Sequence, residues 1–263
     1  MSQLVRTVRE GSLVLVTISR PDKRNALNAE TLRALGRVFR PSAADPDVAL
    51  VILTGSGTRA FAAGGDLHEL QALRSPQAIE EFTRAARATL DGIRRFPVPV
   101  VAALNGDALG GGAELAVACD ARIAAAHARI GFVQGKLALS TAWGGGIDLM
   151  RLLGLARALE LLASGRLVTA TEAVTIGLVS CVAPPEEDLG AFARRWCAAW
   201  LAQPPQVMRA FKRQALAERL GLPREDRDHL ELEDFVSNWL HADHWRAAES
   251  LIAGLRGPDA LSE

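Results

Sequence analysis

Residues 98–125, which read VPVVAALNGDALGGGAELAVACDARIAA, contain the pattern that decides the fold. The apolar run Val98–Leu104 is typical of a β-strand. The glycines at 110–112 then lead into an apolar helix that begins near Glu114, and Ala121–Ala125 predicts a further short strand. A strand, a glycine-rich loop, a helix and another strand in this order indicate an α/β fold.

The flanking sequence continues the alternation of strands and helices. Apolar and β-branched runs predict three further strands, at Leu13–Ile18, Val48–Thr54 and Leu178–Val182. Apolar periodicity predicts three helices: one capped by Asn28, one over Leu67–Arg95 and one over Leu149–Leu162.

The C-terminal part of the chain reads differently, because no strand is predicted in residues 190–263. This segment reads as helical, with breaks near Pro204-Pro205 and at 221–223. It carries four of the five tryptophans, so we expect it to pack on the core or on another subunit.

Composition excludes several classes of protein. The chain has 263 residues with 30 basic and 30 acidic side chains, and this zero net charge removes the bulk electrostatic argument for nucleic-acid binding. The three cysteines are widely spaced without a CxxC pair, which argues against a disulfide framework and a zinc site. No segment reads as a signal peptide or reaches the roughly 18 apolar residues of a membrane span, so we expect a cytoplasmic protein.

Three glycine clusters, at 64–65, 110–112 and 144–146, could carry chemistry. None of them has the spacing of a dinucleotide-binding, P-loop or nucleophile-elbow motif. Two such loops can instead direct two backbone N–H groups at one point, which is the arrangement of an oxyanion hole. Glu114 follows one cluster directly and would place a carboxylate beside those donors.

Three motifs in order resemble the enoyl-CoA hydratase/isomerase (crotonase) family. They are ISRPDKRNALNAETL at 18–32, GTRAFAAGGDLHEL at 57–70 and AALNGDALGGGAELAVACDARIA at 102–124. The resemblance implies a spiral of ββα turns followed by helices used in trimer contacts, and chemistry that stabilises a thioester enolate. On this basis we expect an acyl-CoA-binding α/β core at 1–190 and a helical trimerisation region at 191–263.

The resemblance also assigns site residues. It implies oxyanion donors at the backbone N–H groups of Gly65 and Gly111, with Glu114 as the acid/base. The segment from Lys23 to Leu27 resembles the family's coenzyme A loop. The expected contacts with the substrate or its coenzyme A moiety are Lys23, Arg24 at the phosphates, Ala26 and Ala63 at the adenine, Asp66 as a loop-orienting residue, Leu67, His68 and Trp143.

One departure from the family pattern leaves the reaction open. Hydratases of the family use a second glutamate about twenty residues after the first, and Gln134 stands at that position. Glutamine cannot exchange a proton as a carboxylate does. One hypothesis is therefore hydration or isomerisation of an enoyl-CoA with Glu114 alone.

A second hypothesis is decarboxylation of a malonyl-type thioester in a dry pocket bounded by Gln134 and Trp143. The segment also resembles the ethylmalonyl-CoA decarboxylase branch, which has a histidine at the position of Gln134. A non-catalytic coenzyme A- or RNA-binding role is a third hypothesis, which the zero net charge and the intact glycines disfavour. We expect a homotrimer or homohexamer, no membrane or nucleic-acid partner, no metal, and no cofactor apart from the coenzyme A of the substrate.

Overall fold

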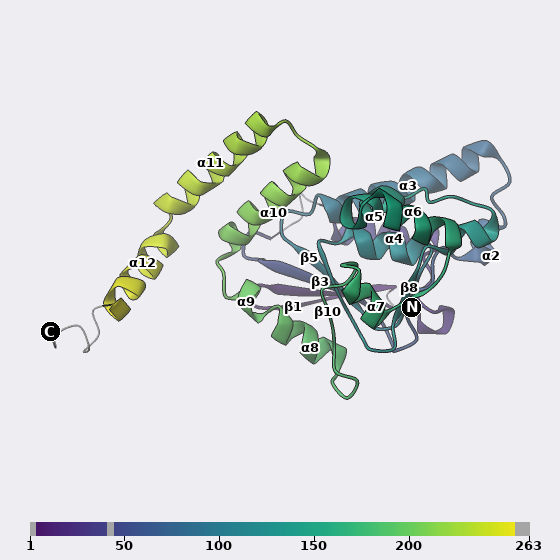
Figure 1. The fold of residues 1–263 in the computed structure, drawn as a ribbon, viewed down its shortest axis with the longest axis horizontal. Coiled ribbons are helices and arrows are strands. Elements are labelled where there is room, and N and C mark those ends of the chain that lie inside the picture. The colour runs from purple at the N-terminus through teal and green to yellow at the C-terminus, as the bar shows by residue number, and fades with distance from the viewer. Residues whose placement is uncertain (1–3, 41–44, 256–263) are drawn as a thin grey trace.

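The computed structural model describes residues 4–40 and 45–255, which fold around two β-sheets (Figure 1). The larger sheet has the order β1-β2-β3-β5-β7-β10, and all of its neighbours are parallel except β1 and β2. Its strands are Val5–Glu10, Leu13–Ile18, Leu50–Gly55, Val100–Leu104, Ala121–Ala124 and Cys181–Val182. The smaller sheet has the order β4-β6-β8-β9 and is formed by Ala60–Ala62, Asp107–Leu109, Arg129–Gly131 and Val168–Thr169.

Three successive ββα turns connect these two sheets. In each turn a strand of the larger sheet is followed by a three-residue strand of the smaller sheet and then by helical structure. The turns are β3-β4 with α2 (Leu67–Leu70) and α3 (Pro76–Arg94), β5-β6 with α4 (Gly111–Ala118), and β7-β8 with the 3-10 helix Val133–Leu137 and α5 (Gly145–Leu153). This confirms the predicted α/β fold.

The geometry of the smaller sheet decides where the loops meet. Strands β4, β6 and β8 are parallel neighbours. The carboxyl ends of parallel strands lie at one edge of a sheet, so the loops after these three strands converge there.

The hydrophobic core covers both faces of the larger sheet. Strand β5 is buried at every residue, as expected for a parallel strand covered on both sides. Helices α3 and α4 pack on one face, and α8 (Leu189–Trp196) packs on the other. There Phe192 and Cys197 join Ile52 and Val101 in one apolar cluster.

Two predicted helices are each divided in the structure, which makes the prediction of single helices wrong. The segment over 67–95 forms α2 and α3, because Ser75 is extended at φ −98° and ψ 147° ahead of Pro76. A residue before proline is disfavoured in helical conformation, so the break follows from the sequence. The segment over 149–162 is divided at Gly154, whose φ of +78° separates α5 from α6 (Leu155–Ser164).

Five strands were not predicted from the sequence, namely β1, β4, β6, β8 and β9. Strand β1 pairs in register with β2, but only Val5 of its six residues is buried. It therefore lacks the apolar alternation by which a strand is recognised. The other four have two or three residues each, too few for any periodicity.

The remaining segments between and after the strands are largely helical. Asn28 caps α1 (Ala29–Val38) as predicted, and its side chain accepts a hydrogen bond from the backbone N–H of Thr31. The remaining helices are the 3-10 helix η1 (Pro21–Lys23), α7 (Ala170–Thr175), α9 (Ala198–Leu201), α10 (Pro205–Leu220), α11 (Arg224–Leu240) and α12 (Ala242–Leu255).

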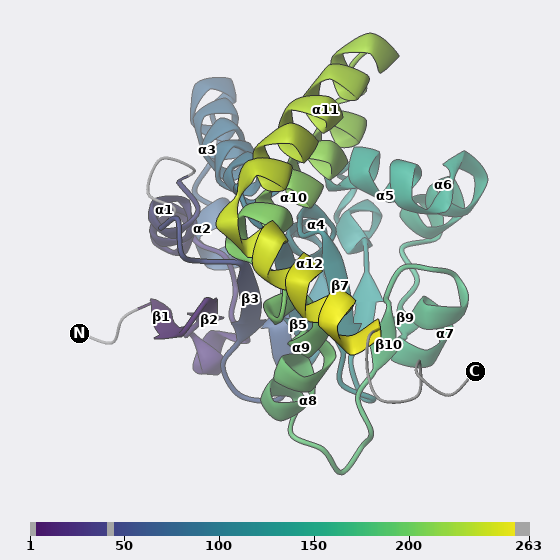
Figure 2. The same ribbon diagram turned by 90° about the vertical axis from the view of Figure 1, so that its left-hand side faces the viewer.

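The last two helices project away from the sheets, whereas α10 lies against the core (Figures 1 and 2). The predicted breaks near Pro204-Pro205 and at 221–223 are confirmed. Within the described ranges, no helix combines the length and apolar character needed to cross a bilayer.

Candidate active site

Glu114 lies in the first turn of α4 with only 2% of its surface exposed. The backbone N–H groups of Trp143 and Gly145 each donate a hydrogen bond of 2.9 Å to its Oε2. The side-chain amide of Gln134 donates to Oε1 at 3.0 Å. The carboxylate is therefore held by the helix on which it lies and by the loops that follow β8 and precede α5.

The environment of Glu114 raises the pKa of its carboxyl above the ordinary value. Burial is the dominant cause, while the hydrogen bonds from Gly145, Trp143 and Gln134 lower the pKa. From the sequence alone, an apolar pocket is expected to raise the pKa of Glu114 and the helix N-terminus to lower it, and the sequence does not decide which effect is larger. In the structure the effect of desolvation exceeds that of the hydrogen bonds, so the pKa of the carboxyl is raised.

The two predicted oxyanion glycines follow the neighbouring strands β4 and β6. In the part of the chain that the structure describes, neither the N–H of Gly65 nor that of Gly111 donates to a backbone carbonyl. Gly111 is the first residue of α4, where helix N–H groups have no partner within the helix. Both N–H groups are consequently available to a ligand.

The Trp143 side chain packs against both glycines. A Cβ atom built on Gly111 would lie 2.6 Å from Trp143 Cη2, and one built on Gly65 would lie 3.9 Å from the same atom. The indole is buried and makes a tilted contact with Phe82, with the ring centroids 6.0 Å apart. The ring therefore forms an apolar wall directly beside the candidate oxyanion site.

Gln134 lies in the 3-10 helix after β8, which is the third loop at this edge. Its amide nitrogen contacts Glu114, while its buried Oε1 has no hydrogen-bond partner among the described residues. An amide can rotate to exchange its donor and acceptor. Gln134 can therefore donate to the Glu114 carboxylate or accept from the protonated acid.

The predicted coenzyme A loop lies beside the first glycine loop. The Leu27 N–H donates to Gly64 O at 2.8 Å, and the Ala63 N–H donates to Arg24 O at 3.1 Å. Ala26 O accepts a hydrogen bond of 2.5 Å from the Arg20 side chain. The predicted residues Arg24, Ala26 and Ala63 thus lie on adjoining backbone segments.

Asp66 has the local geometry expected of a loop-orienting residue. Its Oδ1 accepts from the His68 N–H at 3.2 Å, and its Oδ2 pairs with Arg20 at 2.9 Å. Although burial acts to raise the pKa of this carboxyl, its contacts with Arg20 and His68 leave the pKa below the usual range. Leu67, His68 and Lys23 are exposed, and none of them is among the hydrogen-bond partners of Glu114 in the described residues.

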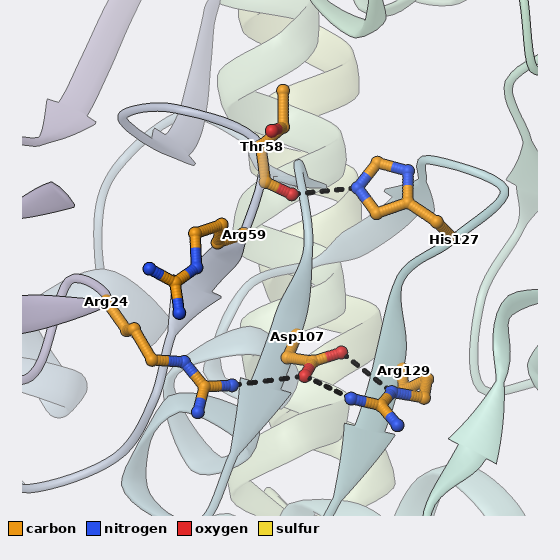
Figure 3. Close-up of a pocket in the computed structure, with 6 residues that line it drawn as sticks. All are labelled: Arg24, Thr58, Arg59, Asp107, His127 and Arg129. Atoms are coloured by element: carbon orange, nitrogen blue, oxygen red, sulfur yellow. Dashed lines mark hydrogen bonds and ion pairs between the residues drawn. The ribbon is translucent and has the colours of Figure 1, made fainter.

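A cationic hollow of about 620 Å³ opens at the amino ends of the same three short strands. Figure 3 shows Asp107 between the guanidinium groups of Arg24 and Arg129. The hollow is lined by Arg24, Thr58, Arg59, Asp107, His127 and Arg129. With three arginines and one aspartate, its formal charge favours an anionic group.

Several of these residues were missed by sequence reasoning. No motif in the sequence marks His127, an exposed residue whose ring bonds Thr58 O at 2.8 Å at the edge of the hollow (Figure 3). Arg59, Asp107 and Arg129 lie next to or within the short strands. That they lie at the same edge of the sheet follows only from the pairing of these strands in the structure.

Comparisons with known proteins agree with this architecture. The family model described as enoyl-CoA hydratase/isomerase matches residues 8–253. The chain is 41% identical over 181 residues to the crotonyl-CoA hydratase of Syntrophomonas wolfei, covering 69% of each chain. It is 38% identical over 179 residues to the short-chain-enoyl-CoA hydratase of Clostridium acetobutylicum, covering 68% of each.

A solved enoyl-CoA hydratase from Bacillus anthracis superposes with a TM-score of 0.89 at 30% identity. The match covers 96% of this chain and 97% of that structure. Family model, relatives and fold agree over most of the sequence, so the chain belongs to the enoyl-CoA hydratase/isomerase family of enzymes.

Proposed function

We propose that the protein hydrates short-chain 2-enoyl-CoA thioesters, with Glu114 as the acid and base. The observation that carries this proposal is the buried Glu114 carboxylate one turn after the free Gly111 N–H. This arrangement would put a proton-transfer group and an oxyanion donor on the same helix end.

In the proposed reaction, the thioester oxygen accepts hydrogen bonds from Gly65 and Gly111. Glu114 takes a proton from water while the water oxygen bonds to C3, and the electron pair of the double bond moves to form the enolate. The protonated Glu114 then donates that proton to C2. The donors favour the enolate over the ground state because negative charge reaches the thioester oxygen only as the enolate forms.

Gln134 has a supporting role in this proposal. Its amide lies 3.0 Å from Glu114, where the family pattern has a second carboxylate. The unpartnered Oε1 can accept a hydrogen bond from the attacking water and orient it. The reaction requires no cofactor beyond the coenzyme A of the substrate.

The position of Trp143 supports a short acyl group. Its ring covers both oxyanion glycines and separates them from Phe82. Phe82 also lines an apolar cavity of about 360 Å³ between α1 and α3. A long acyl chain would have to displace the indole to reach this cavity. The crotonyl-CoA and short-chain-enoyl-CoA hydratase names of the relatives agree with this size limit.

Replacing Trp143 with leucine should therefore extend the range of acyl chains. We expect kcat/KM for a ten-carbon enoyl-CoA, divided by kcat/KM for crotonyl-CoA, to rise at least about tenfold. Even one methylene group that enters an apolar pocket contributes a factor of this size. Steady-state kinetics on both thioesters measure the ratio. An unchanged ratio in a folded variant would contradict the size limit, and Trp196→Leu is a matched control in α8, away from the candidate site.

We also propose that the cationic hollow binds the phosphates of coenzyme A. Arg24 links the two regions, since its backbone contacts Ala63 and its side chain enters the hollow. Charge-assisted hydrogen bonds between arginine and phosphate are strong and bidentate. This assignment supports a path for the thioester from the glycine loops past Ala26 to the hollow.

Replacing Arg24 with alanine should raise KM for crotonyl-CoA by about tenfold, the loss of one charge-assisted contact, with little change in kcat. The same variant should act on crotonyl-pantetheine as the unchanged enzyme does, because that substrate has no nucleotide. Kinetics on the two substrates separate the outcomes. An equal effect on both would place Arg24 away from the phosphates.

Decarboxylation of a malonyl-type thioester is the second candidate, favoured by one observation. The neutral Gln134 contacts Glu114 where a second carboxylate would repel an anionic substrate. In this reaction the C–C bond breaks, CO₂ leaves, the electron pair forms the same enolate, and Glu114 supplies the proton to C2.

An assay on crotonyl-CoA and ethylmalonyl-CoA side by side tests the proposed function. Loss of enoyl absorbance supports hydration, whereas turnover of ethylmalonyl-CoA alone, with CO₂ release, would replace it by decarboxylation.

We further propose a homotrimer, single or paired into a hexamer. Apolar side chains gather exposed on α11, including Phe235, Val236, Trp239 and Leu240. Exposed apolar surface of this kind marks an interaction face. The mass in solution, compared with the 28.0 kDa of one chain, tests the assembly.

A further inference from the structure

A chain of buried polar contacts begins at the peptides that hold Glu114. Residues 141–144 form an irregular segment before α5, and the N–H groups of Trp143 and Gly145 at its end bind the Glu114 carboxylate. The carbonyl of Trp143 points the other way and accepts a hydrogen bond of 2.9 Å from Arg94 Nη2. Arg94 thus binds the Trp143–Gly144 peptide, which lies between the two peptides whose N–H groups bind Glu114.

Each of the three guanidinium nitrogens of Arg94 donates a hydrogen bond. Nε donates to Asp148 Oδ2 at 2.7 Å, and Nη1 donates to Asp91 Oδ1 at 2.7 Å. Only 9% of the Arg94 side chain is exposed. The guanidinium also lies against Gly144, where a Cβ atom would come within 2.8 Å of Nη2. A glycine at φ +93° is therefore required at this contact.

A second arginine closes the contacts into a ring. Arg219 of α10 approaches Asp148 Oδ1 at 3.4 Å. Its Nη1 and Nη2 donate to the carbonyls of Ala118 and Val117 at 2.9 and 2.8 Å. These carbonyls end α4, the helix that begins with Gly111 and bears Glu114. The ring runs from Glu114 through the 143–145 peptides, Arg94, Asp148 and Arg219 back to α4.

We propose that Arg94 is a positioning residue that fixes the Trp143–Gly144 peptide and thereby keeps the N–H groups on either side of it, those of Trp143 and Gly145, directed at Glu114. The kinetic part of this inference rests on the proposed role of Glu114 in hydration, whereas the structural part does not. Arg94 makes no hydrogen bond to Glu114 itself. Its effect on the carboxyl is transmitted through the Trp143–Gly144 peptide to the peptides on either side of it.

Among the described residues, no charged side chain around α4 provides another route by which Arg94 could act on the Glu114 carboxyl through hydrogen bonds. The elements packed against α4 carry Arg94 and Asp91 on α3, Asp148 on α5, Asp107 on β6 and Arg122 on β7, with Arg219 reaching its end from α10. None of these side chains is hydrogen-bonded to the Glu114 carboxylate, whose partners in the described structure are two peptide N–H groups and the Gln134 amide.

Loss of Arg94 has a defined sign. Without its donor, the Trp143 carbonyl turns toward other partners, the Trp143–Gly144 peptide rotates, and the adjoining N–H groups of Trp143 and Gly145 move away from Glu114. Hydrogen bonds to the charged form of a carboxyl lower its pKa, so losing one raises the pKa of Glu114 further. We expect an upward shift of about one unit, a tenfold gain in proton affinity.

The test is a titration of Glu114 that requires no substrate. Protein labelled with ¹³C at the glutamate carboxyl carbon is titrated by NMR, and the Glu114 signal is identified by its absence in Glu114→Gln. Arg94→Met removes the donor entirely. Arg94→Lys keeps a cation for Asp148 but cannot reach three partners at once, and it serves where the methionine variant does not fold.

Arg122→Met is the matched control. Arg122 is also a buried arginine that binds backbone carbonyls, among them those of Leu178 and Cys119, but in the described structure it makes no hydrogen bond to residues 143–145. Both arginine losses should lower the melting temperature, and only the Arg94 variants should raise the pKa of Glu114. An unchanged Glu114 titration in a folded Arg94→Lys protein would overturn the proposal.

Kinetics separate this inference from the proposed function. If crotonyl-CoA is hydrated, the Glu114 limb of the pH profile of kcat/KM should move up by the same amount in Arg94→Lys. A shifted NMR titration in a protein that does not hydrate crotonyl-CoA would leave the role of Arg94 intact and remove the hydratase assignment. An unshifted Glu114 titration in a protein that hydrates crotonyl-CoA would remove the role of Arg94 and leave the hydratase assignment intact.

Discussion

Replacing Glu114 with glutamine is expected to lower kcat for hydration of crotonyl-CoA by about 10²- to 10⁴-fold, the usual contribution of a positioned general acid/base. The loss should be large because Gln134 cannot substitute for the carboxylate that it contacts. KM should change little, since the oxyanion donors remain. Stopped-flow measurement of enoyl absorbance gives both constants.

The same variant has a second, opposite consequence for stability. Burial raises the pKa of Glu114 in the folded protein above its unfolded value. The carboxyl therefore favours folding most when it is protonated, and this contribution is lost as pH rises through the folded-state pKa. Glu114→Gln is neutral at every pH, so its advantage in unfolding free energy over the unchanged protein should grow from acidic to neutral pH.

Denaturant unfolding at several pH values measures this difference. The glutamine also retains its local partners, because its Oε1 can accept from Trp143 and Gly145 while Gln134 rotates to accept from its amide. A folded Glu114→Gln protein with full hydratase activity would remove Glu114 from the proposed mechanism.

Replacing Gly111 with proline is expected to lower kcat by about 10²- to 10³-fold, equivalent to about 2.7–4 kcal/mol for one oxyanion donor. Proline deletes the N–H and is well tolerated at the first position of a helix, which Gly111 occupies in α4. Any side chain here also meets Trp143, because a Cβ would lie 2.3 Å from the indole Cζ3.

Gly111→Ala supplies the matched comparison, since alanine adds the same Cβ and keeps the N–H. Both variants are best made together with Trp143→Leu, which removes the ring atoms that the Cβ would meet. The ratio of their kcat values then reports the N–H alone. Equal rates for proline and alanine would show that the Gly111 N–H does not bind the reacting oxygen.

The part of the fold that could be predicted is the part with long apolar runs. Strands β2, β3, β5 and β7 were predicted within two residues at either end. The signal is an apolar run of at least four residues in β2, β3 and β5, whereas Arg122 interrupts the apolar residues of β7. The short strands β4, β6 and β8 were not predicted. They are stabilised by pairing with one another rather than by any pattern of their own.

The candidate site divides in the same way. Gly65, Gly111 and Glu114 carry a motif, and the structure brings them together. The donors that hold Glu114 are backbone N–H groups of Trp143 and Gly145, which any residue except proline could supply. No residue type marks them in a sequence.

Arg94 shows a second limit of sequence reasoning. It ends an amphipathic helix and reads as a solvent-exposed charge, while its partner Asp148 is 54 residues away. Burial of an arginine becomes acceptable only when carboxylates and carbonyls surround it. That condition depends on tertiary contacts, which periodicity does not reveal.

The ring through Arg219 also has a consequence for the order in which the enzyme is made. Every residue that the candidate site contributes, up to Gly145, precedes residue 146, yet the arginine that ties the ring to the end of α4 lies in α10. A nascent chain emerges from the ribosome N-terminus first. The residues of the candidate site are therefore translated before Arg219, which supports them. The site reaches its final geometry only after α10 has left the exit tunnel.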